Sequence, residues 1–392
     1  MTSLPFVSHF LAQLPLADAL RDAGHDVRFA TSGDLAATVD AARFERVNVI
    51  FKAGPGVEEL SLRNEDGSRP VHVWMPTAAR VAPALLRAFE AWRPEVVIRD
   101  PLDFGSCLAA ERAGLPHAVG REGPFLRPED RQNALGTDLD ELRQQLDLPP
   151  DPETEMLYRY LALVFAPPQL LPAGLYVPPV SHFIRPAPID DVFGVAFEPW
   201  VPPASDRPFV YATLGTVFNS GHFGLLQTMA RALANRPYDA LVTCGPRTDL
   251  RSFDWAADIS NITVKRFVPQ SRVLPHCDVM LAHGGFHSVM GALVHGVPMV
   301  LLPLGGDHHR NAQWCADNGA ALVLEDSARD VENIARAIRQ VMSNPSYSWA
   351  SQRLQTAIDD LPPISRAVEL VEILAATKAP LRRQQVERPL QP

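Results

Sequence analysis

The second half of the chain alternates short apolar runs with helical patterns, and this alternation restricts the fold more than any other feature of the sequence. Six runs rich in aliphatic and β-branched residues, from FVYATLGT to AALVL, occur between residues 209 and 324. The segments FGLLQTMARALANR and RDVENIARAIRQVM place apolar residues at helical spacing. Strands that are apolar on both faces and alternate with helices predict an α/β fold with a parallel sheet covered by helices.

The first half repeats this pattern less regularly. LPLADALRDAGHDVRFAT predicts a helix, a turn at Gly24 and a strand, and residues 85–120 predict helix, strand, helix and strand. From about Arg127 to Tyr160 the pattern becomes polar and helical, with Pro149 and Pro150 inside it. A stretch of this kind between sheet elements often borders a substrate cleft.

The length and the proline distribution predict two domains. A chain of 392 residues is too long for a single hydrophobic core. The segment 197–208 is rich in proline and aperiodic, and we expect it to link a domain of residues 1–196 to a second domain of residues 209–360. Residues 361–392 contain a helix and a tail, which we expect to pack on the N-terminal domain.

Composition excludes several classes of protein. The net charge of −9 argues against a nucleic-acid partner, which usually meets a basic stripe. Four cysteines without a CxxC pair are typical of buried thiols in a reducing cytosol. The apolar stretches are too short for a membrane span, and no basic region precedes an apolar run at the N-terminus. The sequence therefore predicts a cytoplasmic protein without a membrane partner.

The run LAHGGFHSVMGALVHG, residues 281–296, predicts a strand end, a glycine turn and a helix start. The first N–H groups of a helix and its dipole attract anions, and Gly284 and Gly285 let the backbone approach a phosphate closely. His283 and Ser288 add further hydrogen-bond donors. The run therefore favours a diphosphate site.

Two other interpretations of this run remain open. His283 and His287 have the spacing of two metal ligands on one helical face, and Asp307, His308 and His309 could complete a metal shell. However, the glycine pair interrupts the helix that this spacing requires. Alternatively, His287 covers the helix surface without a ligand.

Other strand ends place small, polar or aromatic residues where a parallel sheet binds its ligands. Gly215 and Thr216 follow the first strand of the second half. Phe267–Gln270 follows a later strand, and Asp307 and His308 follow the strand PMVLL. We expect these residues to lie around the same ligand.

The block from Phe267 to Gln313 resembles the nucleotide-sugar signature of family 1 glycosyltransferases, and HGGFHSVMGALVHGVPMVLLPLGGD carries most of the match. Nearly the whole chain resembles actinobacterial enzymes that glycosylate macrolide, polyketide and enediyne aglycones. The resemblance implies a GT-B fold, in which two Rossmann-like domains face each other across a cleft. It also implies inverting transfer of a deoxysugar, carried by TDP rather than UDP, to a hydroxyl of a hydrophobic acceptor. No metal or cofactor is implied, and the protein is expected to be a monomer or homodimer.

The resemblance also implies the donor contacts. In the family an aromatic–x–Pro–Gln segment holds the base, the HGG segment holds the diphosphate, and an Asp-Gln pair contacts sugar hydroxyls. Here that pair reads Asp307-His308. The implied donor-binding residues are Gly215, Thr216, Phe267, Val268, Gln270, His283, Gly285, His287, Ser288, Asp307 and His308.

The first half resembles the part of the family that supplies the catalytic base. SLPFVSHFLAQLPLADALRDAGHD is similar to the family's Gly-His segment, although Ser8 replaces the usual glycine and Ala12 a common proline. The resemblance implies that His9 is the general base and that Asp100 orients it. Alternatively, His9 is an ordinary loop histidine and Asp100 is a helix N-cap, although Asp103 is the better candidate for the cap.

The start of the chain departs from the family. The family's first strand should precede Ser3, yet only Met1 and Thr2 do so. We expect either an abbreviated leading strand or a native start upstream of Met1. An apolar acceptor wall is expected from residues of the first half: Phe6, Phe10, Trp74, Met75 and Phe125.

Three other functions could use the same residues. A nucleotide-sugar epimerase would share the diphosphate turn, and a metallohydrolase would use the histidines and Asp307. A non-catalytic auxiliary homologue would keep the fold without turnover.

Overall fold

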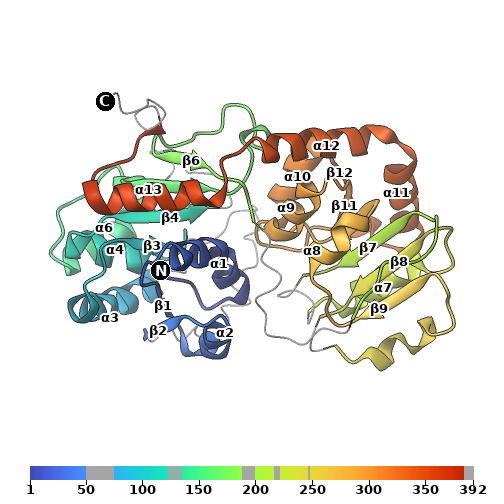
Figure 1. Cartoon of the computed structure of the whole chain (residues 1–392), viewed down its shortest axis with the longest axis horizontal. Coiled ribbons are helices and arrows are strands. Elements are labelled where there is room, and N and C mark those ends of the chain that lie inside the picture. Colours follow the sequence, from blue (N-terminus) through green and yellow to red (C-terminus); the bar gives the residue numbers. More distant parts are fainter. Residues whose placement is uncertain are drawn as a thin grey trace. The chain divides into compact units, whose positions relative to one another are not determined.

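The computed structural model describes residues 1–49, 75–121, 127, 131, 135–187, 199–215, 221–245 and 248–383. The chain forms two compact units, and each is described by itself. Unit 1 comprises Met1–Ala166, Ala173–Gly194 and Leu361–Pro392, and unit 2 comprises Pro167–Pro172 and Val195–Asp360. Both are built from parallel strands and helices (Figure 1). Over the described ranges, none of the helices has the length and apolarity needed to cross a bilayer.

Unit 2 contains one six-stranded sheet in which every pairing is parallel. All six apolar runs of the second half form its strands, as the sequence predicts. They are β7 (Phe209–Thr213), β8 (Asp239–Thr243), β9 (Ile262–Lys265), β10 (Val279–Ala282), β11 (Met299–Leu301) and β12 (Ala321–Val323).

The strand order is β12-β11-β10-β7-β8-β9. From β7 the chain first adds β8 and β9 on one side, and it then returns to add β10, β11 and β12 on the other side. Ala282 at the end of β10 pairs with Thr213 at the end of β7. Loops that leave a parallel sheet on the two sides of such a reversal diverge and leave room for a ligand. The segments after Thr213 and Ala282 therefore start side by side at the switch point of the sheet.

Helices cover both faces of the unit 2 sheet. They are α7 (Phe223–Leu233), α8 (Gln270–Val273), α9 (Phe286–Val294), α10 (His308–Asp317), α11 (Val331–Ser343) and α12 (Pro345–Asp359). Ile334 and Ile338 of α11 are buried with Leu226 and Met229 of α7 in one core cluster. Because these residues recur every three or four positions, each helix buries one stripe against the strands.

Unit 1 has a four-stranded parallel sheet and a separate two-stranded one. The strands are β3 (Val97–Arg99), β4 (His117–Arg121), β5 (Leu161–Val164) and β6 (Ser181–Phe183), with β1 (Arg28–Thr31) and β2 (Glu45–Asn48) in the pair. The helices are α1 (Val7–Asp22), α2 (Ala36–Ala41), α3 (Met75–Trp92), α4 (Phe104–Ala113), α6 (Thr137–Gln145) and α13 (Ile364–Thr377).

The first three residues lie between the two sheets of unit 1. The Thr2 amide donates to Ile98 O at 2.8 Å, and Thr2 O accepts from the Asp100 amide at 3.2 Å. On the other side, the Ala30 amide donates to Met1 O at 2.8 Å. This short segment thus takes the place of a strand between β1 and β3, and it fixes the backbone that leads into α1.

The helix α13 completes unit 1 from the far end of the sequence (Figure 1). Ala367 and Leu370 are buried with Leu16 and Leu20 of α1 in one apolar cluster. Since these two helices are more than three hundred residues apart, this cluster joins the two ends of the described chain.

Candidate functional site

His9 and Asp100 form a hydrogen-bonded pair in unit 1. His9 lies in the first turn of α1, and Asp100 follows β3 directly. The distance from His9 Nδ1 to Asp100 Oδ2 is 2.7 Å, and the side chains are 31% and 2% exposed. Because an ionised carboxylate can only accept a hydrogen bond, Nδ1 of His9 carries the proton and donates it, and the lone pair of the neutral ring lies on Nε2. The pair therefore presents a base supported by a buried carboxylate.

Two neighbouring carboxylates, Asp103 and Asp100, have different roles. Asp103 is the N-cap of α4 and accepts from the Ser106 amide at 3.0 Å, which confirms the predicted cap. Burial raises the pKa of Asp103. Asp100 also accepts a backbone N–H, from Leu102 at 2.9 Å, but through Oδ1. One oxygen of Asp100 thus closes a turn while the other holds His9.

In unit 2, the run of residues 281–296 folds as the strand, turn and helix that the sequence predicts. β10 ends at Ala282, Gly284 has φ +85°, and Gly285 is the N-cap of α9. A Cβ on Gly284 would lie 3.0 Å from His308 O, and one on Gly285 would lie 2.4 Å from His283 Nε2. Gly284 is therefore favoured by its backbone conformation and by a close contact, whereas Gly285, with φ −62°, is favoured by the contact with His283 alone.

His283 fills the space above this turn. A Cβ on Gly215 would lie 2.6 Å from its Cε1 atom, and its ring packs edge-on against His308 with centroids 4.5 Å apart. Burial lowers the pKa of His283 to about 4, although Asp307 opposes the shift. The imidazole is therefore neutral at pH 7 and can donate one hydrogen bond without carrying a charge.

The segment Phe267–Gln270 meets the glycine turn through a side-chain hydrogen bond. Gln270 is the first residue of α8, and its Nε2 donates to Ser288 Oγ at 3.3 Å. Phe267 is half-buried, whereas the Val268 side chain is buried. Of these two residues, Phe267 is therefore the more accessible to a ligand.

Asp307 and His308 differ in exposure. Asp307 is the N-cap of α10, and its side chain is 27% exposed. His308 is buried, and its Nδ1 accepts the Leu304 and Gly305 amides at 3.4 and 3.3 Å. The histidine that stands in place of the family's glutamine thus supports the loop before α10.

The remaining predicted residues have varied positions. His287 is half-buried, with its ring 5.8 Å from that of Phe286. Thr216, Trp74 and Phe125 lie outside the described residues. Within the ranges that the structure covers, no three His, Cys, Asp or Glu side chains are arranged to hold a metal ion.

The expected acceptor wall is only partly available. Phe10 and Met75 are buried in core clusters, so the structure corrects their assignment to this wall. Phe6 is half-buried, and its ring centroid lies 5.4 Å from that of His9.

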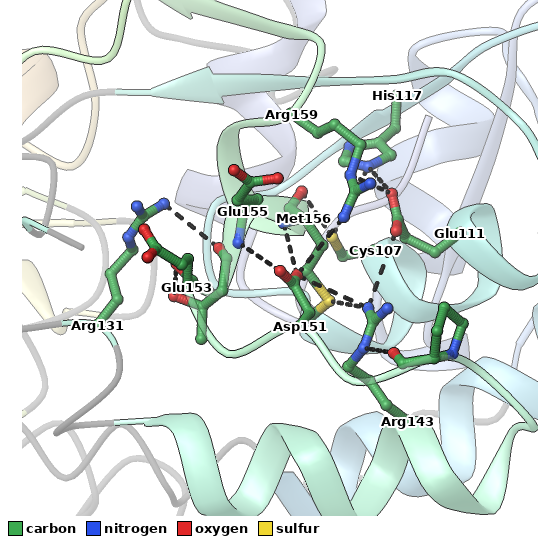
Figure 2. Close-up of polar contacts among 12 residues, drawn as sticks. Cys107, Glu111, His117, Arg131, Arg143, Asp151, Glu153, Glu155, Met156 and Arg159 are labelled. Carbon is green, nitrogen blue, oxygen red and sulfur yellow. Dashed lines mark hydrogen bonds and ion pairs between the residues drawn. The ribbon is translucent and has the colours of Figure 1, made fainter. Parts of the chain in front are cut away.

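No sequence pattern points to a second polar cluster in unit 1, which Figure 2 shows. Glu111 of α4 contacts His117 at 3.3 Å and Arg159 at 3.2 Å, and Arg143 of α6 lies 3.8 Å away. Asp151 lies 3.8 Å from Arg143 and 3.6 Å from Arg159. The polar stretch 127–160 therefore supplies charges that close a buried network.

This network holds a loop in place beside a cavity. Asp151 accepts the amides of Glu155 and Met156 at 3.0 and 2.9 Å, and Arg143 donates to Pro149 O at 2.8 Å. The neighbouring cavity of about 550 Å³ is lined by residues that include Arg159. No local pattern could reveal the cluster, since its members are far apart in sequence.

Comparison with known proteins matches both halves of the chain to known families. Residues 164–385 match the family described as UDP-glucoronosyl and UDP-glucosyl transferase, and residues 18–170 match the erythromycin biosynthesis protein CIII-like N-terminal domain. The 3-alpha-mycarosylerythronolide B desosaminyl transferase of Saccharopolyspora erythraea is 26% identical over 96% of this chain and 97% of its own. The demethyllactenocin mycarosyltransferase of Streptomyces fradiae is 30% identical over 76% of this chain and 69% of its own.

Solved structures show the same fold. The spinosyn rhamnosyltransferase SpnG, solved with thymidine diphosphate, aligns with a TM-score of 0.79 and 23% identity over 95% of this chain and 99% of its own. Its likeness establishes the two-domain GT-B architecture. Since the family match spans more than half of the sequence, the chain belongs to the UDP-glucoronosyl and UDP-glucosyl transferase family and is a GT-B glycosyltransferase related to actinobacterial natural-product enzymes.

Proposed function

We propose that the protein transfers a deoxysugar from a nucleoside-diphosphate sugar, TDP-linked in preference to UDP-linked, to a hydroxyl of a hydrophobic natural-product aglycone. The observation that carries the proposal is the His9–Asp100 pair, in which a buried carboxylate lies 2.7 Å from a partly exposed imidazole. His9 Nε2 removes the hydroxyl proton as the acceptor oxygen attacks the anomeric carbon. Asp100 stabilises the imidazolium that forms.

The reaction is a single displacement, so the anomeric configuration inverts and an α-linked donor yields a β-glycoside. General-base assistance contributes roughly 10²–10⁴-fold to the rate. The nucleoside diphosphate leaves with its charge stabilised by fixed N–H groups of the glycine turn and by the α9 dipole. His283 adds a neutral donor, and no metal ion takes part.

We assign the donor contacts to residues of the second half of the chain. The proposal places the diphosphate against Gly215, Gly285, His287 and Ser288, with Thr216 beside it. Phe267 stacks on the base, and the backbone of Val268 and the amide of Gln270 contact its edge. Gln270 and Ser288 are already in hydrogen-bond contact, which supports one continuous site.

Asp307 contacts the sugar in this proposal, and His308 supports the loop. A deoxysugar fits, because only Asp307 of the pair offers a substantially exposed polar side chain. The relatives named as a desosaminyl transferase and a mycarosyltransferase support a donor and an acceptor of this class.

Thermal unfolding with TDP, UDP or buffer, each with and without EDTA, tests the donor assignment. A ligand at a hundred times its Kd stabilises the folded state by ~2.7 kcal/mol, which raises the midpoint by roughly 5–10 °C for a domain of this size. We expect TDP to raise the midpoint more than UDP and EDTA to have no effect. A midpoint that EDTA lowers and neither nucleotide raises would favour the metal site instead.

Gly285→Ala is the matching variant. Its Cβ would lie 2.4 Å from His283 Nε2, so either the His283 ring or the turn must shift, and the midpoint increase with TDP should disappear. Gly224→Ala is the control, because Gly224 lies in α7 of the same unit with open space around the added Cβ. The diphosphate assignment fails if Gly285→Ala responds to TDP as strongly as Gly224→Ala.

A further inference from the structure

A single buried amide connects the glycine turn to Asp307. Asn311 lies in the second turn of α10 and is 2% exposed. Its Nδ2 donates to Gly284 O at 3.1 Å and to Asp307 Oδ2 at 2.7 Å. A side-chain amide nitrogen carries two hydrogens, so both are used by these two acceptors.

The bond to Gly284 orients the peptide group that follows it. The carbonyl of Gly284 and the N–H of Gly285 belong to one planar trans peptide, so they point in opposite directions. With the carbonyl held on Asn311, the Gly285 N–H points away from α10. Gly284 has φ +85° and so has the conformational freedom to rotate this peptide if the bond is lost.

The bond to Asp307 orients the carboxylate. Asp307 and Asn311 are four residues apart on α10, which places their side chains on one face. The Asn311 amide also donates to Asp307 O at 3.0 Å, so the first helical turn is intact. Oδ2 is held by Asn311 and lies 4.0 Å from Arg310, and Oδ1 lies 4.0 Å from His308 Nε2.

We propose that Asn311 is a positioning residue that couples the diphosphate turn to the sugar-contacting carboxylate of Asp307. This inference rests on the proposed function, because it takes the turn and Asp307 as parts of one donor site. The geometry aligns a phosphate-facing N–H and a sugar-facing carboxylate through one side chain. Loss of the Asn311 side chain should then weaken the binding of a nucleotide sugar more than the binding of the nucleoside diphosphate alone.

Titration calorimetry with TDP and TDP-glucose tests the coupling in Asn311→Ala. We expect a loss of about 10-fold in TDP affinity and on the order of 100-fold in TDP-glucose affinity, since one hydrogen bond is lost at the turn and a second at the carboxylate. Asn318→Ala is the control: Asn318 ends the same helix, and its amide donates to Trp314 O at 2.9 Å. It should change both affinities equally and by little.

A double-mutant cycle separates coupling from a general structural effect. In an Asp307→Ala background the carboxylate is already absent, so adding Asn311→Ala should affect only the glycine turn. It should then lower the affinities for TDP and TDP-glucose by the same factor. If Asn311→Ala does not fold, Asn311→Ser serves instead. A helical serine hydroxyl bonds the carbonyl four residues earlier, which here is Asp307 O, and so cannot bridge to Gly284.

The outcomes are distinct. If wild-type protein binds neither TDP nor UDP, the proposed function fails and the coupling fails with it. If the wild type binds TDP but Asn311→Ala weakens the binding of TDP and of TDP-glucose equally, or by no more than Asn318→Ala does, the coupling alone is overturned. A selective loss of TDP-glucose affinity that disappears in the Asp307→Ala background supports it.

Discussion

Two of the histidine–carboxylate pairs in unit 1 look alike in chemistry and differ in setting. His9 lies 2.7 Å from Asp100, and His117 lies 3.3 Å from Glu111. The imidazole of His9 is 31% exposed, whereas that of His117 is 2% exposed. The first pair can meet a substrate, and the second is enclosed by protein.

Burial and neighbouring charges shift the pKa values of His117 and Glu111 in the enclosed pair. Burial lowers the pKa of His117 more than Glu111 raises it. Burial raises the pKa of Glu111, but its hydrogen bond to His117 and its ion pairs with Arg159 and Arg143 outweigh this, so the net shift is downward. A carboxylate shared among two arginines and a buried imidazole is a structural centre. A carboxylate committed to one reachable histidine supports a base.

His9→Asn gives the largest expected difference between the two pairs. Asparagine keeps a donor for Asp100 but has no basic nitrogen, so kcat should fall by roughly 10²–10⁴-fold. Stability should change by only about 0.5 kcal/mol, as at other exposed positions. Initial rates on an acceptor that the wild type glycosylates, together with the unfolding midpoint, measure both. The catalytic assignment is wrong if turnover survives.

Glu111→Gln should have the opposite profile. Removing one charge from a buried network leaves Arg143 and Arg159 with Asp151 alone, and the unfolding free energy should fall by about 3 kcal/mol. A denaturant titration measures this loss, while kcat of the folded fraction stays at the wild-type value. A variant that unfolds like the wild type would show that the network adds nothing to stability.

Acidification should give the smallest effect. A buried histidine with a lowered pKa takes up its proton in the unfolded state first, so stability falls as pH drops below 6.5. For His283, whose pKa is about 4, the loss between pH 7.5 and 5.5 is about 1 kcal/mol, and His117 contributes with the same sign. His283→Asn should flatten this dependence. TDP should also flatten it, because an adjacent anion raises the pKa of His283. An unchanged slope in His283→Asn contradicts the assignment.

Contiguous features were predictable from the sequence. The glycine pair after an apolar run specifies a strand, a turn and a helix, because each step depends on residues within one turn of the next. The six strands of unit 2 follow from periodicity for the same reason. Asp103 could be identified as a cap, since its acceptor lies only three residues ahead.

Features that depend on distant partners were not predictable from physical pattern alone. His9 and Asp100 are 91 residues apart, and only the family resemblance brought them together. Asn311 sits in an ordinary helical stretch, and its importance comes from Gly284, 27 residues away. Arg143 and Arg159 appear as solvent-exposed charges in the sequence, because nothing local shows that Glu111 and Asp151 will meet them.

The interleaving of the chain between the units has a practical consequence for recombining donor and acceptor preferences among relatives. A single exchange point in the linker would replace α13 together with unit 2. It would set a foreign helix against Leu16 and Leu20 of α1. A chimera that exchanges Val195–Asp360 and the short segment Pro167–Pro172, while keeping Leu361–Pro392 with its own N-terminal half, preserves every apolar contact of α1 with α13. The modular boundary of this enzyme therefore has four crossing points.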